Sequence, residues 1–472
     1  MPSREDTPTR TVDVAVLGAG TAGLAAYRAA IAASKTAVII DPGPGGTTCA
    51  RVGCMPSKLL IAAAEAAHHA EAAGPFGVHA KVRIDGREVM DRVRRERDRF
   101  VGLVQRGVES FPEADKIHGR GELVAPGRIA VGETLIDARA VVIATGSSPV
   151  VPPIFTLLGD RLIVNDDVFA WTDLPRSVVV FGAGVIGLEL GQALSRLGVR
   201  VRMFGRNGGL GGLSDPAVKA SALAAFQAEL PVDTDAKVLE VGREGDAVRV
   251  RFVDVDGAEK TESFEFALVT AGRRPNVHGL GLDRSGVELG DNGIPLYDPS
   301  TLQCGSSSVF IAGDVNDDVP LLHEAADEGK IAGENAARFP VVRPGLRRSL
   351  LAIVFTEPNL AVAGARFSDL SRAFAPGDLV TGEVGFEDQG RSRVMLQNRG
   401  LLHVYADRKT GRFLGAEVAG PRAEHLAHLL AWSHQQGLTV AQMLTMPFYH
   451  PVVEEGLRTA LRDAAAKLAA SH

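Results

Sequence analysis

Two cysteines five positions apart, Cys49 and Cys54, are the residues of this chain best suited to chemistry. In a regular helix this spacing gives a rise of about 7.5 Å, whereas a disulfide needs Cα atoms about 4.4–6.8 Å apart. The backbone must therefore bend, and Gly53 and Pro56 permit a bend, because glycine reaches unusual φ angles and proline is tolerated in the first turn of a helix. We expect Cys54 near a helix N-terminus, where the macrodipole favours a thiolate. The pattern indicates a redox-active pair.

Two other interpretations of the cysteines are open. Free cysteines often pack as small buried apolar residues, so two in one segment can occur by chance. A structural zinc site needs four ligands, but Cys304 is the one remaining cysteine and no histidine stands at ligand spacing beside the pair. We therefore expect no metal site.

The composition is that of an ordinary globular protein. With 472 residues, 45% hydrophobic and 23% charged, the chain is long enough for several domains. A net charge of −6 provides no basic surface for nucleic acid or membrane. Residues 1–10 are polar, and no apolar run of about 18 residues follows, so neither a signal peptide nor a membrane span is expected. We expect a cytoplasmic protein, a compartment in which paired cysteines indicate catalysis or redox sensing.

A glycine-rich turn joins a strand to a helix near the N-terminus. Residues 11–17 predict a buried strand, an alanine-rich helix follows, and a second strand at 37–40 ends in an acid. This order is the dinucleotide-binding fingerprint: the glycines let the backbone approach a pyrophosphate, the helix N-terminus attracts it, and the acid binds a ribose hydroxyl. The glycines are Gly18, Gly20 and Gly23, and the acid is Asp41.

The same order recurs at mid-chain, with strands expected at 177–181 and 199–204. Arg206 stands where the acid of an NAD site would be, and NADP sites place arginine there for the 2′-phosphate. This favours NADP, although Arg202 and Arg206 are also compatible with solvated loop charges. The glycines of this copy are Gly182, Gly184 and Gly187.

Two such copies imply two dinucleotides, an arrangement suited to electron transfer between a flavin and a nicotinamide. Further strands, each running into a glycine, are expected at residues 141–146, 267–275 and 308–314. From about residue 346 the pattern changes to strands at 401–406 and 413–418 and a helix at 421–435, which predicts an α+β module.

Six ordered motifs resemble those of the flavin-containing pyridine nucleotide-disulfide oxidoreductases, the group of dihydrolipoamide dehydrogenase and glutathione reductase. The resemblance covers nearly the whole chain. Besides the two fingerprints, the motifs are the cysteine pair followed by Pro56-Ser57-Lys58, then Ala144-Thr145-Gly146, Ala312-Gly313-Asp314, and His450-Pro451 followed by Glu455.

The resemblance implies an α/β fold with two Rossmann-like dinucleotide-binding domains and a C-terminal α+β dimerisation domain. It implies an FAD-binding domain at 1–150, an NAD(P)-binding domain at 151–273, the second part of the FAD-binding domain at 274–345 and the dimerisation domain at 346–472. The expected assembly is a homodimer whose active site is shared between subunits.

The resemblance also assigns roles. Cys54 would face the flavin, Cys49 would exchange with the substrate, and Lys58, paired with Glu189, would lie near the flavin. The implied acid/base is His450, oriented by Glu455 and reaching the cysteines of the other subunit. Implied FAD contacts are Gly18, Gly20, Gly23, Asp41, Thr48, Lys58, Thr145, Gly146, Gly313 and Asp314, and implied NAD(P) contacts are Gly182, Gly184, Gly187, Arg206 and Gly272.

Departures from the family pattern bear on the substrate. This chain has Gly46-Thr47-Thr48-Cys49 where the family usually has glycine-glycine-threonine-cysteine, and Arg51 where the family usually has an asparagine. Val185 replaces the gating tyrosine of glutathione reductases and favours the lipoamide branch, whereas Arg206 favours NADPH. We expect a dihydrolipoyl dehydrogenase that converts dihydrolipoamide and NAD⁺ to lipoamide and NADH.

The alternatives are an NADPH-dependent reductase of glutathione disulfide, another low-molecular-weight disulfide or quinones, and a non-catalytic flavoprotein subunit. Mercuric reductases and large thioredoxin reductases need a further cysteine pair near the C-terminus, and no cysteine follows Cys304. The remaining expected partner is a small-molecule or lipoyl-domain dithiol, with no nucleic acid and no membrane.

Overall fold

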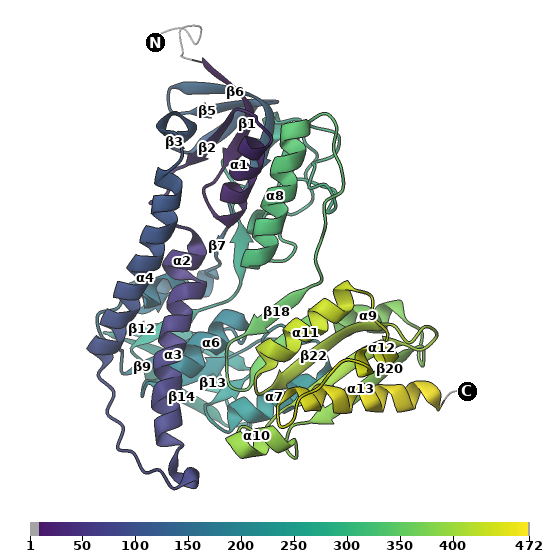
Figure 1. Cartoon of the computed structure of the whole chain (residues 1–472). Coiled ribbons are helices and arrows are strands. Elements are labelled where there is room, and N and C mark those ends of the chain that lie inside the picture. The colour runs from purple at the N-terminus through teal and green to yellow at the C-terminus, as the bar shows by residue number, and fades with distance from the viewer. Residues whose placement is uncertain (1–8, 471–472) are drawn as a thin grey trace. The chain divides into compact units, whose positions relative to one another are not determined.

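The computed structural model describes residues 9–470, which form two compact units (Figure 1). The first comprises Met1–Pro56, Val93–Val150 and Arg273–Arg347, and the second comprises Ser57–Arg92, Val151–Gly272 and Arg348–His472. The helices α3 (Cys54–Glu71) and α4 (Gly86–Glu109) contribute residues to both units. Most of the polar opening segment of the sequence, residues 1–8, lies outside the described residues. Within residues 9–470, the structure contains no helix that is both apolar and long enough to span a bilayer.

The first unit is built on a mixed sheet with the order β3-β2-β1-β6-β5-β4, in which β17 also pairs with β6. β1 is parallel to both β2 and β6, and β17 is parallel to β6. The sheet therefore includes the strand expected near 141–146 and also the strand expected near 308–314. The strands are β1 Thr9–Leu17, β2 Ala37–Asp41, β3 Lys116–His118, β4 Gly121–Ala125, β5 Arg128–Val131, β6 Thr134–Ile143 and β17 Val309–Ile311.

Two helices, α1 (Thr21–Ala32) and α8 (Leu322–Arg338), pack side by side against this sheet (Figure 1). Their backbones nearly touch, because a Cβ atom on Gly329 would lie 2.1 Å from the carbonyl oxygen of Ala22, and one on Gly333 would lie 2.4 Å from that of Ala26. Glycine at these two positions therefore brings α8 close enough to hold α1, whose N-terminus belongs to the first fingerprint.

The second unit contains a parallel sheet with the order β11-β10-β9-β15-β8 and an antiparallel sheet with the order β12-β13-β14. The helix α6 (Val185–Arg196) links β9 to β10 and completes the second fingerprint. The other elements are β8 Leu162–Ile163, α5 Asn165–Val168, β9 Ser177–Phe181, β10 Arg200–Phe204, α7 Pro216–Gln227, β11 Val232–Asp233, β12 Lys237–Glu244, β13 Ala247–Val253, β14 Glu259–Phe264 and β15 Phe266–Val269.

The single strand expected at 267–275 is wrong. The chain forms β15 (Phe266–Val269) in the parallel sheet, and then a separate short strand, β16 (Arg273–Pro275), which pairs antiparallel with β7 (Ser147–Pro149). Gly272 separates the two strands with a φ of +112°, a left-handed value that ends the extended run.

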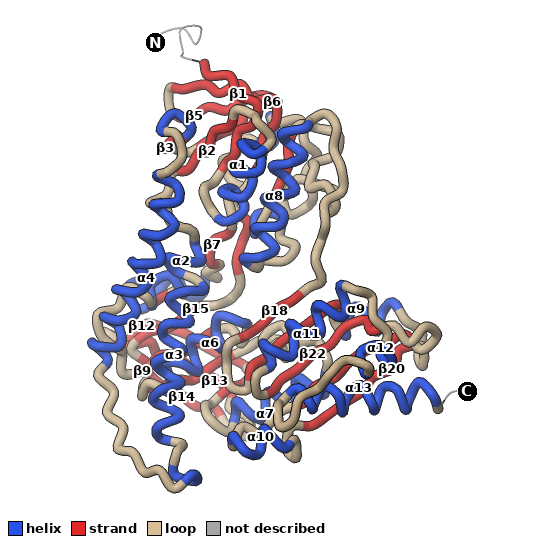
Figure 2. The backbone as a smooth tube through the Cα atoms, viewed as in Figure 1, coloured by secondary structure: helices blue, strands red, loops and turns tan. Residues whose placement is uncertain are grey.

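The C-terminal module, β18 to α13, is an antiparallel sheet with the order β18-β19-β22-β21-β20, against which α11 and α13 pack (Figure 2). One buried cluster of apolar side chains from the strands and these helices forms its core. The expected α+β module is therefore confirmed. Its elements are β18 Leu351–Val354, β19 Asn359–Gly364, α9 Phe367–Ala373, β20 Leu379–Gly385, α10 Gly390–Met395, β21 Leu401–Asp407, β22 Phe413–Gly420, α11 Ala423–Gln435, α12 Val440–Leu444 and α13 Glu454–Ala469.

Candidate active site

The cysteine pair lies where one short helix gives way to a long one. Cys49 is in α2 (Thr48–Val52), and Cys54 is the first residue of α3, which agrees with the position expected near a helix N-terminus. Gly53 stands between the helices with a φ of −127°, so its role is not a left-handed turn. A Cβ atom there would lie 3.2 Å from the Cα atom of Cys49, so glycine is needed for close approach of the backbone.

The two thiols interact directly. Neither is in a disulfide, and Cys54 is exposed while Cys49 is partly buried. The hydrogen bond between the Cys49 and Cys54 side chains is the main cause that raises the pKa of Cys49, and burial adds to it, while the backbone amides of Cys54 and Met55 act in the opposite direction. Burial raises the pKa of the third cysteine, Cys304, to about 12, and this thiol is buried in the core. Cys49 and Cys54 are therefore the thiols that a substrate can reach.

The two glycine-rich turns share one construction. Gly18 and Gly182 have φ values of +108° and +126°, and a Cβ atom on them would lie 2.3 Å from the carbonyl oxygen of Ala144 and 2.4 Å from that of Thr270, respectively. The first glycine of each turn is thus needed both for its φ and for contact with the neighbouring strand end.

The middle glycine of each turn leaves the helix N-terminus open. Gly20 and Gly184 are the N-caps of α1 and α6, no side chain caps either helix, and nothing lies within 4 Å of a Cβ atom placed on either residue. Open helix N-termini attract phosphate through the backbone amides and the macrodipole. Both turns therefore fit the pyrophosphate of a dinucleotide. The third glycines, Gly23 and Gly187, give close packing, since a Cβ atom would lie 1.8 and 1.9 Å from the carbonyl oxygens of Gly18 and Gly182.

The acid of the first fingerprint stands at the end of β2 beside the turn. The Asp41 carboxylate accepts the amide hydrogens of Ala19 at 2.5 Å and Gly43 at 2.6 Å. It is therefore fixed next to the open N-terminus of α1, as a ribose-binding acid requires.

A short hydrogen-bonded chain holds Asp314 in the same unit. Ser147 donates its hydroxyl to Asp314 Oδ2 at 2.9 Å, and Arg273 Nε donates to the Ser147 hydroxyl oxygen at 2.8 Å. Thr145 donates its hydroxyl to the Asn276 carbonyl at 2.8 Å. The sequence analysis identified Thr145 and Asp314 but missed Ser147 and Arg273, because the pairing of β7 with β16 brings them together across 126 residues.

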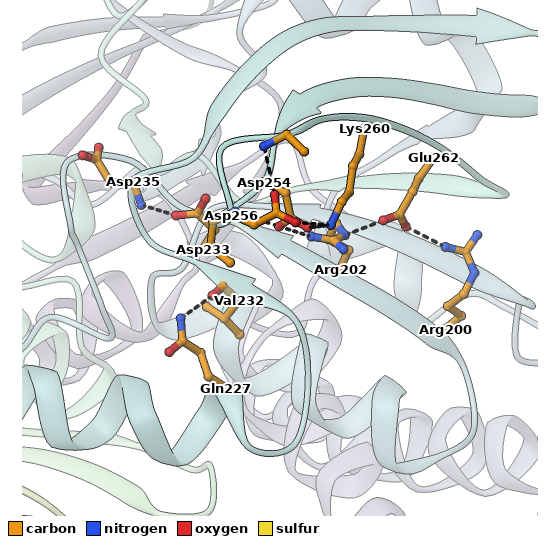
Figure 3. Close-up of polar contacts among 12 residues, drawn as sticks. Arg200, Arg202, Gln227, Val232, Asp233, Asp235, Asp254, Asp256, Lys260 and Glu262 are labelled. Atoms are coloured by element: carbon orange, nitrogen blue, oxygen red, sulfur yellow. Dashed lines mark hydrogen bonds and ion pairs between the residues drawn. The ribbon is translucent and has the colours of Figure 1, made fainter.

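The two arginines at the end of β10 have different environments. Arg202 forms ion pairs with Asp254 and Glu262, at 3.4 and 2.9 Å (Figure 3). Its guanidinium also stacks 4.6 Å from the Phe252 ring centroid. Arg206 is exposed, and no hydrogen bond or ion pair holds its guanidinium within residues 9–470. Arg202 is therefore a structural residue, and Arg206 is the arginine free to meet a ligand.

Lys58 and Glu189 form the expected pair. The Lys58 ammonium donates to both carboxylate oxygens of Glu189, at 2.9 and 2.7 Å. The Glu189 side chain is 5% exposed and that of Lys58 is 34% exposed, so the cation closes over a buried carboxylate. Lys58 lies four residues beyond Cys54 in α3, about one helical turn.

His450 and Glu455 also form the expected pair. Nδ1 of His450 lies 2.9 Å from Glu455 Oε2, and Arg458 donates to Oε1 at 2.9 Å. Burial acts to raise the pKa of Glu455, but the hydrogen bonds from His450 and the Val452 amide and the Arg458 charge hold it below its usual value. The His450 side chain is 81% exposed, so the second ring nitrogen is open to a partner.

The remaining expected contacts are a residue at the start of a helix, Thr48, and glycines of connecting segments. Thr48 is the first residue of α2, and the Gly313 amide donates to Glu328 Oε2 at 2.7 Å. Gly146 and Gly272 have φ values of +68° and +112°, and nothing lies within 4 Å of a Cβ atom placed on either.

No cluster of three or more metal-ligating side chains occurs within the part of the chain that the structure describes.

Residues 12–329 match the family described as pyridine nucleotide-disulphide oxidoreductase, and residues 351–461 match its dimerisation domain. The chain belongs to this family. It is a flavoprotein disulfide oxidoreductase that uses FAD and NAD(P), and its α/β fold with a C-terminal dimerisation domain is that of the family.

Three similar proteins illustrate the range of the family. The dihydrolipoyl dehydrogenase of Halobacterium salinarum is 30% identical over 96% of both chains. The mercuric reductase of Streptomyces lividans is 29% identical over 93% of both chains. The HOCl-induced flavoprotein disulfide reductase RclA of Escherichia coli has the same fold, with a TM-score of 0.80 over 96% of this chain and 99% of that one at 20% identity.

Proposed function

We propose that the protein is a dihydrolipoyl dehydrogenase, which oxidises a dihydrolipoyl dithiol and reduces NAD(P)⁺. The observation that carries the proposal is the placement of two neighbouring thiols, Cys49 in α2 and Cys54 at the start of α3, with Cys54 exposed. Similarity to the dihydrolipoyl dehydrogenases of Halobacterium salinarum and Bacillus subtilis, each 30% identical, supports this substrate class.

The exchange begins with the cysteines joined as a disulfide. A substrate thiolate attacks Cys49, the bond between the cysteines breaks, and Cys54 leaves as a thiolate at the N-terminus of α3, where the macrodipole stabilises it. The second substrate thiolate then attacks the substrate sulfur that is bonded to Cys49. This closes the substrate disulfide and releases Cys49 as a thiolate. Two electrons now reside on the cysteine pair.

His450 moves the protons of this exchange. Its exposed ring nitrogen accepts a proton from a substrate thiol, and Glu455 holds the other nitrogen and stabilises the imidazolium that forms. Because His450 is exposed on the C-terminal module, we propose that it serves the cysteines of a second copy in a homodimer. Four large exposed side chains of the same module support a buried dimer interface: Leu429, Trp432, Met446 and Tyr449.

When bound, FAD would supply two-electron transfer from the cysteine pair and hydride transfer to NAD(P)⁺, the second substrate. The residues proposed to hold FAD are those of the first turn, with Asp41 for a ribose and Asp314, oriented by Ser147, for the ribitol side. The second turn would hold NAD(P). Lys58, fixed by Glu189, would place a positive charge beside the flavin.

A second candidate is an NADPH-dependent reductase of a low-molecular-weight disulfide, in which the same exchange runs in reverse. The exposed and unpaired guanidinium of Arg206 favours it, because a 2′-phosphate needs such a group. For either candidate we propose the cytoplasm as the location.

Steady-state assays of NAD⁺ with dihydrolipoamide, and of NADH and NADPH with lipoamide and glutathione disulfide, test the choice. We expect turnover of dihydrolipoamide with NAD⁺. If that pair is inert while NADPH reduces another disulfide, the dehydrogenase proposal is wrong and the reductase takes its place.

A further inference from the structure

One face of α6 carries three buried polar side chains. Glu189, Gln192 and Arg196 follow each other at intervals of three and four residues, which places them on the same face of the helix. As whole residues, Glu189, Gln192 and Arg196 are 4%, 4% and 8% exposed. Buried polar groups must find hydrogen-bond partners, so whatever packs on this face has to supply them.

Two residues of the C-terminal module, Phe355 and Glu357, supply partners for all three. The Phe355 amide donates to Glu189 Oε1 at 3.0 Å. Gln192 exchanges two hydrogen bonds of 2.8 Å with the backbone of Glu357, and Arg196 forms an ion pair of 3.1 Å with the Glu357 carboxylate. The segment that follows β18 is therefore attached to α6 at Phe355 and at Glu357.

This attachment places the Phe355 ring against Lys58. The Lys58 ammonium lies 4.7 Å from the ring centroid, within the range of a cation–π interaction. The same ammonium donates to Glu189, whose Oε1 also accepts the Phe355 amide. Phe355 thus contacts both members of the pair, the lysine through its ring and the glutamate through its backbone.

We propose that Phe355 is a positioning residue that holds the Lys58 ammonium in place and so sets how strongly that charge favours reduced flavin. The proposal rests on the proposed function only in placing Lys58 beside the flavin. Since 34% of the Lys58 side chain is exposed, Glu189 alone leaves one side of the ammonium open to solvent, and the ring closes part of that side.

The test is the equilibrium of bound flavin with an indicator dye, measured anaerobically in full-length Cys49→Ser/Cys54→Ser protein, so that the flavin alone accepts electrons. A cation beside the flavin stabilises its reduced, negatively charged form. Phe355→Leu removes the ring and keeps the backbone amide. Because a cation–π contact at a partly exposed site is lost in this variant, we expect Phe355→Leu to decrease the equilibrium constant for flavin reduction by about two- to fivefold.

Two control variants separate the ring from general packing. Phe355→Tyr keeps an aromatic face and should leave the constant unchanged. Phe374→Leu makes the same change at the end of α9 in the same module, away from Lys58 in the sequence and without a ring contact to it, and should also have no effect.

A double-mutant cycle shows whether the ring acts through the lysine. In a Lys58→Met/Glu189→Gln background, which removes both charges, Phe355→Leu should cause no further decrease. A decrease that persists in that background, or a Phe355→Leu constant equal to that of the parent, overturns the proposal. If the background variant does not bind FAD, the comparison of leucine with tyrosine at position 355 decides alone. Because no dithiol is used, failure of the dehydrogenase proposal would leave this result intact.

Discussion

Nδ1 of His450 lies 2.9 Å from Glu455 Oε2, five residues away, while 81% of the imidazole side chain remains exposed. The carboxylate is held in turn by Arg458 and by the start of α13, so the ring has a fixed orientation although it has a free edge. An imidazole that is oriented but open to solvent is compatible with the proposal that it acts on a thiol of a second copy of the chain.

Loss of the imidazole should remove acid/base catalysis. We expect His450→Gln to lower kcat/KM for the dithiol by about 10²- to 10⁴-fold, with Glu455→Ala causing a smaller decrease in the same direction. Glu454→Ala changes the neighbouring acid in the same helix and should be neutral. Equal activities of the His450→Gln variant and the parent protein would remove His450 from the mechanism.

Arg206 should decide between the nicotinamide cofactors. A charge-assisted hydrogen bond to the 2′-phosphate corresponds to about 10- to 100-fold in affinity, so Arg206→Glu should raise the KM for NADPH by that factor and leave the KM for NADH within about twofold. Arg176→Glu, at a 95% exposed side chain of the same unit, is the matched control. An unchanged ratio of the two KM values would return Arg206 to a solvated loop charge.

Glu65 should make stability depend on pH. Burial is the main cause that raises the pKa of this carboxyl, and Glu357 adds to it, while His69, Arg196 and Arg422 act in the opposite direction. No hydrogen bond or ion pair reaches the carboxyl within residues 9–470. Its ionisation is therefore costly in the folded state.

The sign follows from the raised pKa. Below the unfolded value of about 4.3 the carboxyl is protonated in both states and costs nothing. The cost grows as pH rises and is complete above the folded pKa. Glu65→Gln should therefore raise the apparent Tm at pH 8 and match the parent near pH 4, whereas Glu71→Gln, on the same helix, should not differ at either pH. A pH-independent difference for Glu65→Gln would contradict this explanation.

The parts of the fold that local pattern controls could be predicted from the sequence. The roles of Gly18 and Gly182 follow from a strand that must turn sharply into a helix, and both strand ends lie where expected. The position of Cys54 at the start of α3 follows similarly from Gly53 and Pro56. The break at Gly272 could not be predicted in the same way. An apolar run predicts a strand, but the sequence does not show that the glycine within it will adopt a left-handed φ and end the strand.

Contacts between distant segments could not be predicted. Phe355 reaches Lys58 from about 300 residues away, and Arg273 reaches Ser147 across 126 residues. Neither residue carries a local spacing that signals its role, since Arg273 depends on the pairing of β16 with β7 and Phe355 depends on the attachment of its segment to α6. Arg202 shows the converse. From the sequence alone its guanidinium could have met a cofactor or solvent, whereas in the fold Asp254, which follows β13, and Glu262 of β14 neutralise it.

The central claim is that Cys49 and Cys54 form a redox pair in which Cys54 faces the flavin. The most direct measurement is the long-wavelength absorbance of the FAD-loaded protein after anaerobic addition of dihydrolipoamide, since a thiolate against oxidised flavin absorbs there. We expect the parent protein to develop the band on addition of the dithiol. Cys49→Ser should show it without dithiol, because Cys54 is then free, and Cys54→Ser should never show it. A band that survives Cys54→Ser would contradict the account.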